Sequence, residues 1–404
     1  MNPWLTIIGI GDNGLDGLSK ESISKINNAE YVFGGERHLS FIPDNGIKKI
    51  LWENPIKNSV EHIISLKSRP VCVLASGNPL WHGIGNTLLK YISVDEMLIH
   101  PSPSVFSLAC AKVGWDLNDV EAISLHTNPV SVIGKYLQQG IKLFLLTKNS
   151  KTPIEVVDYL NKHGFNKSKF IIFENLGGVN ENITTTTVES FDLKDISRLN
   201  VICIECIADT DTNYYSCVPG LPNEIFNNDG QITKREIRAA TLAKLTPFKD
   251  DLLWDIGAGS GSISIEWMRS GKNLKAIAIE CNSRRIEFLK NNAIELGVPN
   301  LEIIQGKAPD ILLGLKKPNA IFIGGGLSGN NGIEIIEKSI NSLLPNGRLV
   351  INAVTIETEI LLINNCKKYG GDLTKIAVSK VKKVGSSIAW DDYMPVVQWL
   401  YHKR

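Results

Sequence analysis

The sequence predicts an α/β protein of two domains, each organised around a largely parallel sheet. The chain has 404 residues, which corresponds to two to three domains at about 150 residues each. Short β-rich apolar runs alternate with helical patterns from end to end, and such alternation indicates crossover units with parallel strands. The alternation is interrupted at Asp209–Pro222, a stretch of turn-forming residues without periodicity. We therefore predict domains at 1–208 and 223–404, joined by a linker at 209–222.

The first half contains seven predicted strands and four predicted helices. The strands are Trp4–Ile10, Pro70–Ala75, Glu96–His100, Val120–Ser124, Ile141–Thr147, Lys169–Glu174 and Val201–Ile207. The helices are Ser19–Asn28, Ser59–Lys67, Ser104–Val113 and Pro153–His163.

The second half repeats the alternation and ends differently. Its strands are Leu252–Ile256, Leu274–Glu280, Leu301–Gln305, Asn319–Ile323 and Gly347–Ala353. Its helices are Thr233–Leu245, Ser260–Ser270, Arg284–Leu296, Gly332–Leu343 and Ile356–Tyr369. Two strand-like runs, Asp372–Val384 and Pro395–Tyr401, close the chain without a helix between them. This pattern predicts a doubly wound mixed sheet that ends in an antiparallel hairpin.

Composition narrows the class of function. Lys and Arg total 43 and Asp and Glu 42, so the net charge of +1 argues against a general nucleic-acid-binding protein. The chain has no apolar run of roughly 18 residues and no basic segment before its first apolar stretch, so neither a membrane span nor a signal peptide is expected. Seven scattered cysteines fit a reducing cytoplasm. Cys203 and Cys206 lie in a strand pattern on opposite faces, and the seven histidines have no ligand spacing, so no metal site is expected.

The sharpest motif is a glycine loop between a predicted strand and helix of the second half, Asp255-Ile-Gly257-Ala258-Gly259-Ser260-Gly261. Such a loop lets a ligand approach the backbone, and Glu280 after the next strand is placed to accept hydrogen bonds from a ribose diol. A dinucleotide, ATP and S-adenosylmethionine are the ligands that such a loop could take. The dinucleotide pattern fails at Ser262, and the Gly-Lys-Ser/Thr of an ATP loop is absent. The spacing resembles motif I of class I methyltransferases.

Two further features of the second half suggest its substrate. Thr233 and Glu236 fit a capping box at a helix start. Lys234 and Arg235 follow Thr233, with Arg238 one turn later; cations there oppose the helix dipole and suggest a nearby anion. Gly324–Gly326 stand where amino-methylating enzymes of this type carry Asn/Asp-Pro-Pro-aromatic, so we expect room for a bulky substrate instead.

Several loops of the first half follow predicted strands. Gly9-Ile10-Gly11-Asp12-Asn13-Gly14 fits the pattern G-x-G-x-x-G, but no acidic residue closes a second strand at the dinucleotide spacing. Further loops lie at 75–83 and 101–105, and another contains His126, an acid/base candidate or a structural histidine. Loops gathered at the strand ends of one sheet form a ligand cleft.

These motifs carry a family resemblance that covers nearly the whole chain. The first half resembles the tetrapyrrole methylases, in the branch that methylates carbon 5 of the cobalamin precursor, through GIGDNGLDGLS, AEYVFGGERHL, LASGNPLWHGIG, PSPSVFSLACAKVGW, SLHTNP and FENLGGVNENI. The second half resembles the class I enzyme that methylates carbon 15 and decarboxylates, through GLPNEIF, DGQITKREIRA, WDIGAGSGSISIEW, AIECN, QGKAPD, FIGGG and GRLVINAVTIET. The chain thus resembles the fused precorrin-6Y C(5,15)-methyltransferase (decarboxylating) family.

The resemblance implies a tetrapyrrole-methylase α/β fold followed by a Rossmann-like class I fold. It implies S-adenosylmethionine at two sites per chain, a precorrin or cobalt-precorrin substrate, a cytoplasmic location and a homo-oligomer. The implied cofactor residues of the first half are Gly9, Gly11, Asp12, Ser76, Gly77, Asn78, Trp81, Ser104 and Val105. Those of the second half are Thr233, Gly257, Ala258, Gly259, Ser260, Gly261, Glu280 and Ala308. Lys234, Arg235 and Arg238 are the candidates for clamping substrate carboxylates.

Two positions depart from the family pattern. Asp12 stands where the family usually has Pro, and Asn78 stands where it usually has Asp. These departures leave open that the first domain is a docking scaffold and that only the second domain is catalytic. An RNA methyltransferase and a dinucleotide oxidoreductase remain as competing functions.

Overall fold

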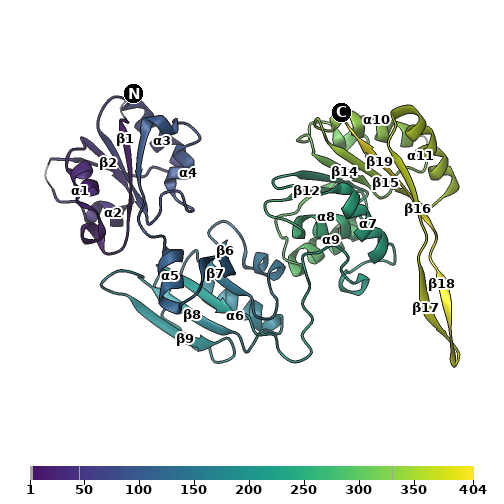
Figure 1. The fold of residues 1–404 in the computed structure, drawn as a ribbon, viewed down its shortest axis with the longest axis horizontal. Coiled ribbons are helices and arrows are strands. Elements are labelled where there is room, and N and C mark those ends of the chain that lie inside the picture. The colour runs from purple at the N-terminus through teal and green to yellow at the C-terminus, as the bar shows by residue number, and fades with distance from the viewer. Residues whose placement is uncertain (1–2, 45, 330) are drawn as a thin grey trace. The chain divides into compact units, whose positions relative to one another are not determined.

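The computed structural model describes residues 3–44, 46–329 and 331–404. It divides into two compact units, of which the first contains residues 1–130 and 139–212 and the second contains 131–138 and 213–404 (Figure 1). Both units consist of helices and sheets. The sequence did not indicate that the short stretch 131–138 belongs with the second unit. Among the described residues, no helix has both the length and the apolar character needed to cross a membrane.

The first sheet of the first unit is parallel throughout, with the order β3-β2-β4-β1-β5. Its strands are β1 (Leu5–Ile10), β2 (Tyr31–Gly34), β3 (Lys48–Leu51), β4 (Val71–Ser76) and β5 (Met97–His100). Its helices are α1 (Lys20–Asn27), α2 (Glu36–Ser40), α3 (Ile56–Ser65) and α4 (Ile84–Leu88). β2 and β3 were not predicted from the sequence, because each has only four residues and β2 ends in glycine. Parallel pairing places the carboxyl ends of β1, β2 and β4 at one edge, where ligands bind in such sheets.

The second sheet of this unit is mostly antiparallel, which corrects the expectation of a largely parallel arrangement. Its order is β6-β7-β10-β8-β9; β6 and β7 run parallel, and the remaining neighbours are antiparallel. The strands are β6 (Val120–Ser124), β7 (Lys142–Leu146), β8 (Lys169–Glu174), β9 (Asn182–Thr187) and β10 (Asn200–Glu205), accompanied by α5 (Val105–Val113) and α6 (Thr152–Lys162). The polar strand β9 (NITTTT) forms a sheet edge, and its alternation was too polar to predict.

The second unit has a seven-stranded mixed sheet of order β13-β12-β11-β14-β15-β19-β16. Its strands are β11 (Leu252–Ile256), β12 (Lys275–Glu280), β13 (Glu302–Gln305), β14 (Ala320–Ile323), β15 (Arg348–Ala353), β16 (Asp372–Ile376) and β19 (Val396–His402). The helices are α7 (Arg235–Leu245), α8 (Ser262–Arg269), α9 (Ser283–Glu295), α10 (Gly332–Ser342) and α11 (Ile356–Tyr369). β19 is antiparallel to both β15 and β16, so the sheet is mixed as predicted.

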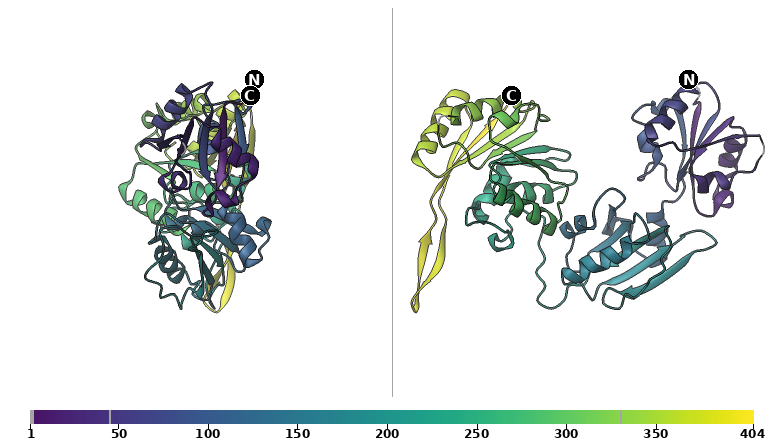
Figure 2. Two further views of the ribbon diagram at one scale, coloured as in Figure 1. Left: turned by 90° about the vertical axis from the view of Figure 1, so that its left-hand side faces the viewer. Right: turned by 180° about the vertical axis from the view of Figure 1, so that it is seen from behind.

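The predicted run Asp372–Val384 is two strands in two different sheets. β16 joins the main sheet, whereas β17 (Ser379–Val384) pairs with β18 (Ser387–Asp392) in a separate antiparallel hairpin. Figures 1 and 2 show this hairpin, which we call the arm, extending away from the body of its unit. Val381, Ile388 and Trp390 on the arm are 58%, 71% and 73% exposed. The arm therefore presents apolar side chains to solvent.

A buried ion pair joins α7 to α8 in the second unit. Arg238 and Glu266 are 0% and 1% exposed, and Arg238 Nε lies 2.5 Å from Glu266 Oε1. Glu266 also accepts hydrogen bonds from the backbone amides of Gly220 and Leu221. Arg238 also donates to the carbonyls of Thr233 and Leu221 and to Asn223 Oδ1. The pair thus holds three separate segments together in the interior of the unit.

We predict that Glu266→Ala lowers the free energy of unfolding of the second unit by about 3–5 kcal/mol, because it leaves the buried Arg238 guanidinium without a counter-ion. Hydrogen exchange of the β11 and β12 amides measures this unit alone. Glu334→Ala is the matched control, since Glu334 pairs with Lys338 at 2.8 Å on an exposed helix surface. The control should cost no more than about 1 kcal/mol. Equal effects of the two substitutions would contradict the assigned role.

Candidate functional site

The glycine loop of the second unit connects β11 to α8 against a neighbouring strand end. Gly257 has φ +72°, and a Cβ there would lie 3.0 Å from the amide nitrogen of Gly325. A side chain at this position is therefore both strained and obstructed. Gly261 is the N-cap residue of α8, and the Asp255 carboxylate accepts from Ser264 N in the first turn at 3.1 Å. The loop thus forms a close backbone surface that leads into a helix N-terminus, where unpaired amides favour polar ligand atoms.

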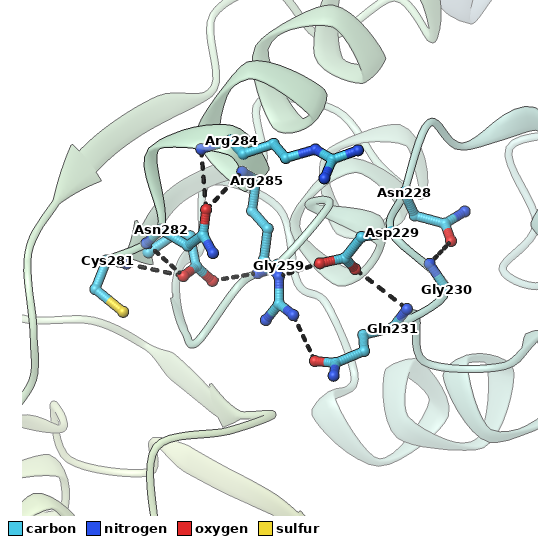
Figure 3. Close-up of polar contacts among 10 residues, drawn as sticks. Asn228, Asp229, Gly230, Gln231, Gly259, Cys281, Asn282, Arg284 and Arg285 are labelled. Carbon is cyan, nitrogen blue, oxygen red and sulfur yellow. Dashed lines mark hydrogen bonds and ion pairs between the residues drawn. The ribbon is translucent and has the colours of Figure 1, made fainter.

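Glu280 ends β12 beside this loop and is fixed by three backbone amides. Its Oε2 accepts from Gly259 N at 2.8 Å, and its Oε1 accepts from Cys281 N and Asn282 N at 2.9 Å each (Figure 3). The side chain is 5% exposed. A carboxylate has about four acceptor positions, so one remains for a hydroxyl donor of a ribose. The residues around Glu280 thus fit the adenosine part of the cofactor that the motif predicts.

A segment without a predicted role lies across the same loop. Asp229 and Gln231 accept hydrogen bonds from Arg285, at 2.8 Å from Nε and 2.5 Å from Nη2 (Figure 3). The Arg285 hydrogen bond also lowers the pKa of the Asp229 carboxyl. A Cβ on Gly259 would lie 4.0 Å from the carbonyl oxygen of Gln231. We call residues 228–231 the strap. Residues 229–231 belong to the motif DGQITKREIRA, but no individual role was predicted for them from the sequence.

The loop, Glu280 and the strap surround a cavity of about 850 Å³. One part of its lining contains the predicted cofactor residues Thr233, Gly257, Ala258, Gly259, Ser260, Glu280 and Ala308, together with Cys281, Arg285 and Lys307. The other part comprises Lys234, Ile237, Phe322, Gly324, Gly325, Gly326, Asn352, Val354, Asp392, Tyr393, Met394 and Val396. The predicted Gly261 is not part of this lining; it packs against Leu289 instead. The lining therefore includes all of the predicted cofactor residues of the second unit except Gly261, together with further apolar and polar residues.

The structure separates the three predicted clamp residues. Lys234 lines the cavity and is the N-cap residue of α7. Arg235 does not line it; its Nε lies 3.9 Å from the Cβ position of Gly220. Arg238, contrary to prediction, has no free surface, because its guanidinium is buried against Glu266. The sequence shows that Arg238 carries a charge, but it does not show that the buried carboxylate of Glu266 pairs with it.

The predicted capping box is also wrong. α7 starts at Arg235, and its N-cap residue is Lys234 instead of Thr233; Lys234 makes no side-chain capping bond. Thr233 contributes its carbonyl to Arg238 instead. Glu236 forms an ion pair with Lys380 of the arm at 3.2 Å. The helix therefore begins two residues later than predicted, and Thr233 and Lys234 are left beside the cavity.

In the first unit, the loops after β1, β4 and β5 pack tightly against one another. A Cβ on Gly9 would lie 1.9 Å from the carbonyl oxygen of Gly77. Gly77 has φ +58°, and a Cβ there would lie 3.1 Å from the Pro103 oxygen and 3.3 Å from Ser104 Cα. Ser104 caps α5 by accepting from Ser107 N at 3.1 Å. The predicted residues Gly9, Ser76, Gly77, Ser104 and Val105 therefore come together at one edge of the parallel sheet.

The two departures from the family pattern have visible partners. Asn78 Oδ1 accepts from Leu80 N at 2.9 Å, a bond that an aspartate oxygen would make equally well. Asp12 Oδ1 forms an ion pair with Arg37 Nη1 at 2.6 Å. Arg37 also reaches Ser76 Oγ at 3.4 Å and His38 Nε2 at 3.1 Å. Burial and the neighbouring Arg37 lower the pKa of His38 to about 4, so this histidine is neutral near pH 7.

Further predicted residues of the first unit lie apart from this edge or inside the fold. Gly11 contacts Asn13 within its own loop. Trp81 stacks on Phe106, with ring centroids 5.6 Å apart, and packs against Phe144 in the core. His126 is exposed as a residue. Partial desolvation of its ring lowers its pKa, and so do the nearby His82 and Lys148. Cys203 and Cys206 are buried free thiols, and the described residues hold no cluster of metal-binding side chains.

Comparison with known proteins assigns a family to both halves. Residues 4–192 match the Tetrapyrrole (Corrin/Porphyrin) Methylases, and residues 224–403 match the Precorrin methyltransferase domain. Two shorter relatives each correspond to part of the chain. A probable cobalt-precorrin-6B C(15)-methyltransferase (decarboxylating) from Saccharolobus solfataricus is 35% identical, over 42% of this chain and 90% of its own length. A cobalt-precorrin-7 C(5)-methyltransferase from Salmonella typhimurium is 30% identical, over 44% of this chain and 88% of its own length.

One relative matches both halves of the chain over its full length. A precorrin-6Y C(5,15)-methyltransferase (decarboxylating) from Sinorhizobium sp is 40% identical over 407 residues, which cover 100% of this chain and 97% of the relative. The similarity therefore includes both units and the segment that joins them. The chain belongs to the precorrin-6Y C(5,15)-methyltransferase (decarboxylating) family.

Proposed function

We propose that the chain methylates a precorrin or cobalt-precorrin macrocycle at carbons 5 and 15, with S-adenosylmethionine as methyl donor, and removes the carboxyl group of an acetate side chain. The observation that carries this proposal is the full-length similarity to a relative named for both methylations and the decarboxylation. We assign carbon 5 to the first unit and carbon 15 with decarboxylation to the second. Relatives named for each single activity, each similar to less than half of the chain, support a division of labour.

S-adenosylmethionine supplies a methyl group already activated on a sulfonium. The protein's contribution is alignment of the methyl group with the carbon nucleophile, and such positioning can supply about 7–11 kcal/mol at the extreme. Glu280 would accept a hydrogen bond from a ribose hydroxyl of the cofactor, and the backbone of the glycine loop would lie against the cofactor. Lys234 at the cavity would bind a substrate carboxylate by a charge-assisted hydrogen bond. Loss of carbon dioxide leaves its electron pair on the ring system, which increases the nucleophilicity of the ring carbon that takes the methyl group.

Mass spectrometry of the reaction with the reduced precorrin-6 macrocycle tests the function. We expect two added methyl groups and loss of one carbon dioxide. The Glu280→Ala chain should add one methyl group without losing carbon dioxide once a carbon-15 product is supplied, because the first unit is intact. If the wild-type chain adds one methyl group with loss of carbon dioxide, the first unit is a scaffold. If neither the metal-free nor the cobalt-loaded macrocycle reacts, the proposal fails.

We further propose two cofactor sites per chain. Titration of the chain with S-adenosylmethionine by calorimetry should give a stoichiometry of two. Glu280→Ala should reduce it to one, because loss of a buried group that binds a hydroxyl weakens only the second site, by about 1.5–3 kcal/mol. Glu287→Ala, an exposed change on α9, is the control and should leave two sites. A stoichiometry of one for the wild-type chain would contradict the proposal.

We also propose a cytoplasmic homo-oligomer assembled through the arm. On one face of the arm, Val381 pairs with Trp390 and Lys383 with Ile388; on the other, Lys380 pairs with Asp391. An exposed two-stranded ribbon with one apolar face and two unpaired edges is marginal by itself and favours a second ribbon.

Val381→Ser with Trp390→Ser should therefore reduce the molar mass measured by light scattering to that of one chain. Val179→Ser is the control, since Val179 is 98% exposed on a loop of the first unit. An unchanged mass of the double variant, or a wild-type chain that is already monomeric, would contradict assembly through the arm.

A further inference from the structure

The base of the arm forms part of the cavity in the second unit. Asp392 ends β18, and Tyr393 and Met394 connect it to β19; all three line the cavity. None of them belongs to the glycine loop, Glu280 or the strap. Met394 is 71% exposed and Val354, which also lines the cavity, is 48% exposed. The cavity thus has an apolar wall that the cofactor does not account for.

Two hydrogen bonds close the base of the hairpin. Tyr393 N donates to the carbonyl of Val378 at 2.9 Å, and Ser379 Oγ donates to Asp392 Oδ1 at 2.5 Å. These bonds hold Asp392 and the Tyr393 amide against Val378 and Ser379 on the facing segment.

Lys380 connects this base to α7. Its Nζ lies 3.2 Å from Glu236 Oε1 and 5.8 Å from the centre of the Tyr393 ring. Glu236 is in the first turn of α7, two residues after the cavity-lining Lys234. The ion pair between Lys380 and Glu236 thus joins the arm to α7, the helix whose N-cap residue Lys234 lines the cavity.

The same cavity contains open space next to Gly325 and Gly326. A Cβ built on Gly325 or Gly326 would meet no atom of the described residues within 4 Å. Gly325 does not have a positive φ, so its lack of a side chain is not required by backbone conformation. Because Gly325 and Gly326 line the cavity, this open space is part of the volume that a ligand could occupy. An aromatic ring and a flexible thioether together suit the face of a large conjugated ring, because both offer broad polarizable surfaces.

We propose that Tyr393 and Met394 form the surface on which the conjugated macrocycle packs during carbon-15 methylation, and that the Lys380–Glu236 pair is a positioning contact that holds this surface against α7. This inference rests on the proposed function and adds the substrate-binding wall of the second site. Lys234 at the same cavity then meets a carboxylate at the edge of the ring. The arm thereby contributes to the site as well as to the proposed assembly.

The primary test is the KM for the reduced precorrin-6 macrocycle in the release of carbon dioxide by the full chain. Tyr393→Ala should raise this KM about tenfold, the effect of losing about 1.4 kcal/mol of ring packing. Tyr393→Phe keeps the ring and should retain the wild-type KM. The KM for S-adenosylmethionine should not change in either variant. An unchanged macrocycle KM in Tyr393→Ala would overturn the proposal, and so would a loss of kcat alone in Tyr393→Phe, which would assign the phenol to proton transfer.

The positioning contact is tested by charge reversal. Lys380→Glu and Glu236→Lys should each raise the macrocycle KM, and the double exchange should restore it, since the pair is then remade in the opposite order. Lys382→Glu is the matched control, because Lys382 pairs with Asp391 within the arm at 3.6 Å and does not line the cavity. If both single changes raise the macrocycle KM and the double exchange does not restore it, the pair is not a positioning contact.

Binding of the macrocycle without S-adenosylmethionine, followed by its absorbance, separates failure of this inference from failure of the proposed function. If the wild-type chain binds the macrocycle but releases no carbon dioxide, the proposed function fails, and the wall is still tested by the dissociation constant of Tyr393→Ala. Gly325→Leu adds a steric test, because it fills the open space and should abolish macrocycle binding while S-adenosylmethionine still binds. Normal macrocycle binding by Gly325→Leu would contradict the location of the site.

Discussion

The cofactor side of the second unit depends on the buried pair of Arg238 and Glu266. Glu266 accepts hydrogen bonds from the backbone amides of Gly220 and Leu221, and Arg238 donates one to the carbonyl of Thr233. These contacts fix the chain on both sides of the strap, which is itself held by polar contacts with the partly exposed Arg285. Because α8 begins directly after the glycine loop, the same pair ties the strap to the loop it crosses. A fully bonded polar network in a buried interior sets one geometry, and here that geometry defines the cavity.

The two units differ in how the loops at their parallel strand ends are built. In the second unit, an acid at a strand end is held by three backbone amides beside a loop with left-handed glycines. In the first unit, the segments at the ends of β1, β4 and β5 approach so closely that Gly9 cannot accept a Cβ, and Asp12 after β1 pairs with Arg37 of α2. The first arrangement offers a side-chain acceptor, whereas the second offers mostly backbone. Glycine patterns alone therefore did not distinguish the two kinds of site.

Sequence patterns predicted the features that depend on local periodicity. The buried strands β11, β12 and β15 and the loop at Gly257 follow from apolar runs and glycine spacing, which act over a few residues. The antiparallel second sheet did not follow, because strand direction depends on how β8, β9 and β10 pair over long separations. The role of Arg238 was missed for the same reason, since its partner is 28 residues away. Tyr393 and Met394 had no sequence signal, because only the hairpin geometry brings them to the cavity.

Asp12 and Asn78, the two departures from the family pattern, both have partners within the first unit. Asn78 makes with an amide oxygen the bond that a carboxylate would make, so the conformation of its loop does not require the charge. Asp12 brings a negative charge that proline lacks, but Arg37 pairs with it at 2.6 Å. Because His38 is neutral near pH 7, the group has no net charge. Arg37 also links Asp12 to Ser76 at the edge where the loops after β1, β4 and β5 converge. Both residues are thus accommodated by partners within the first unit.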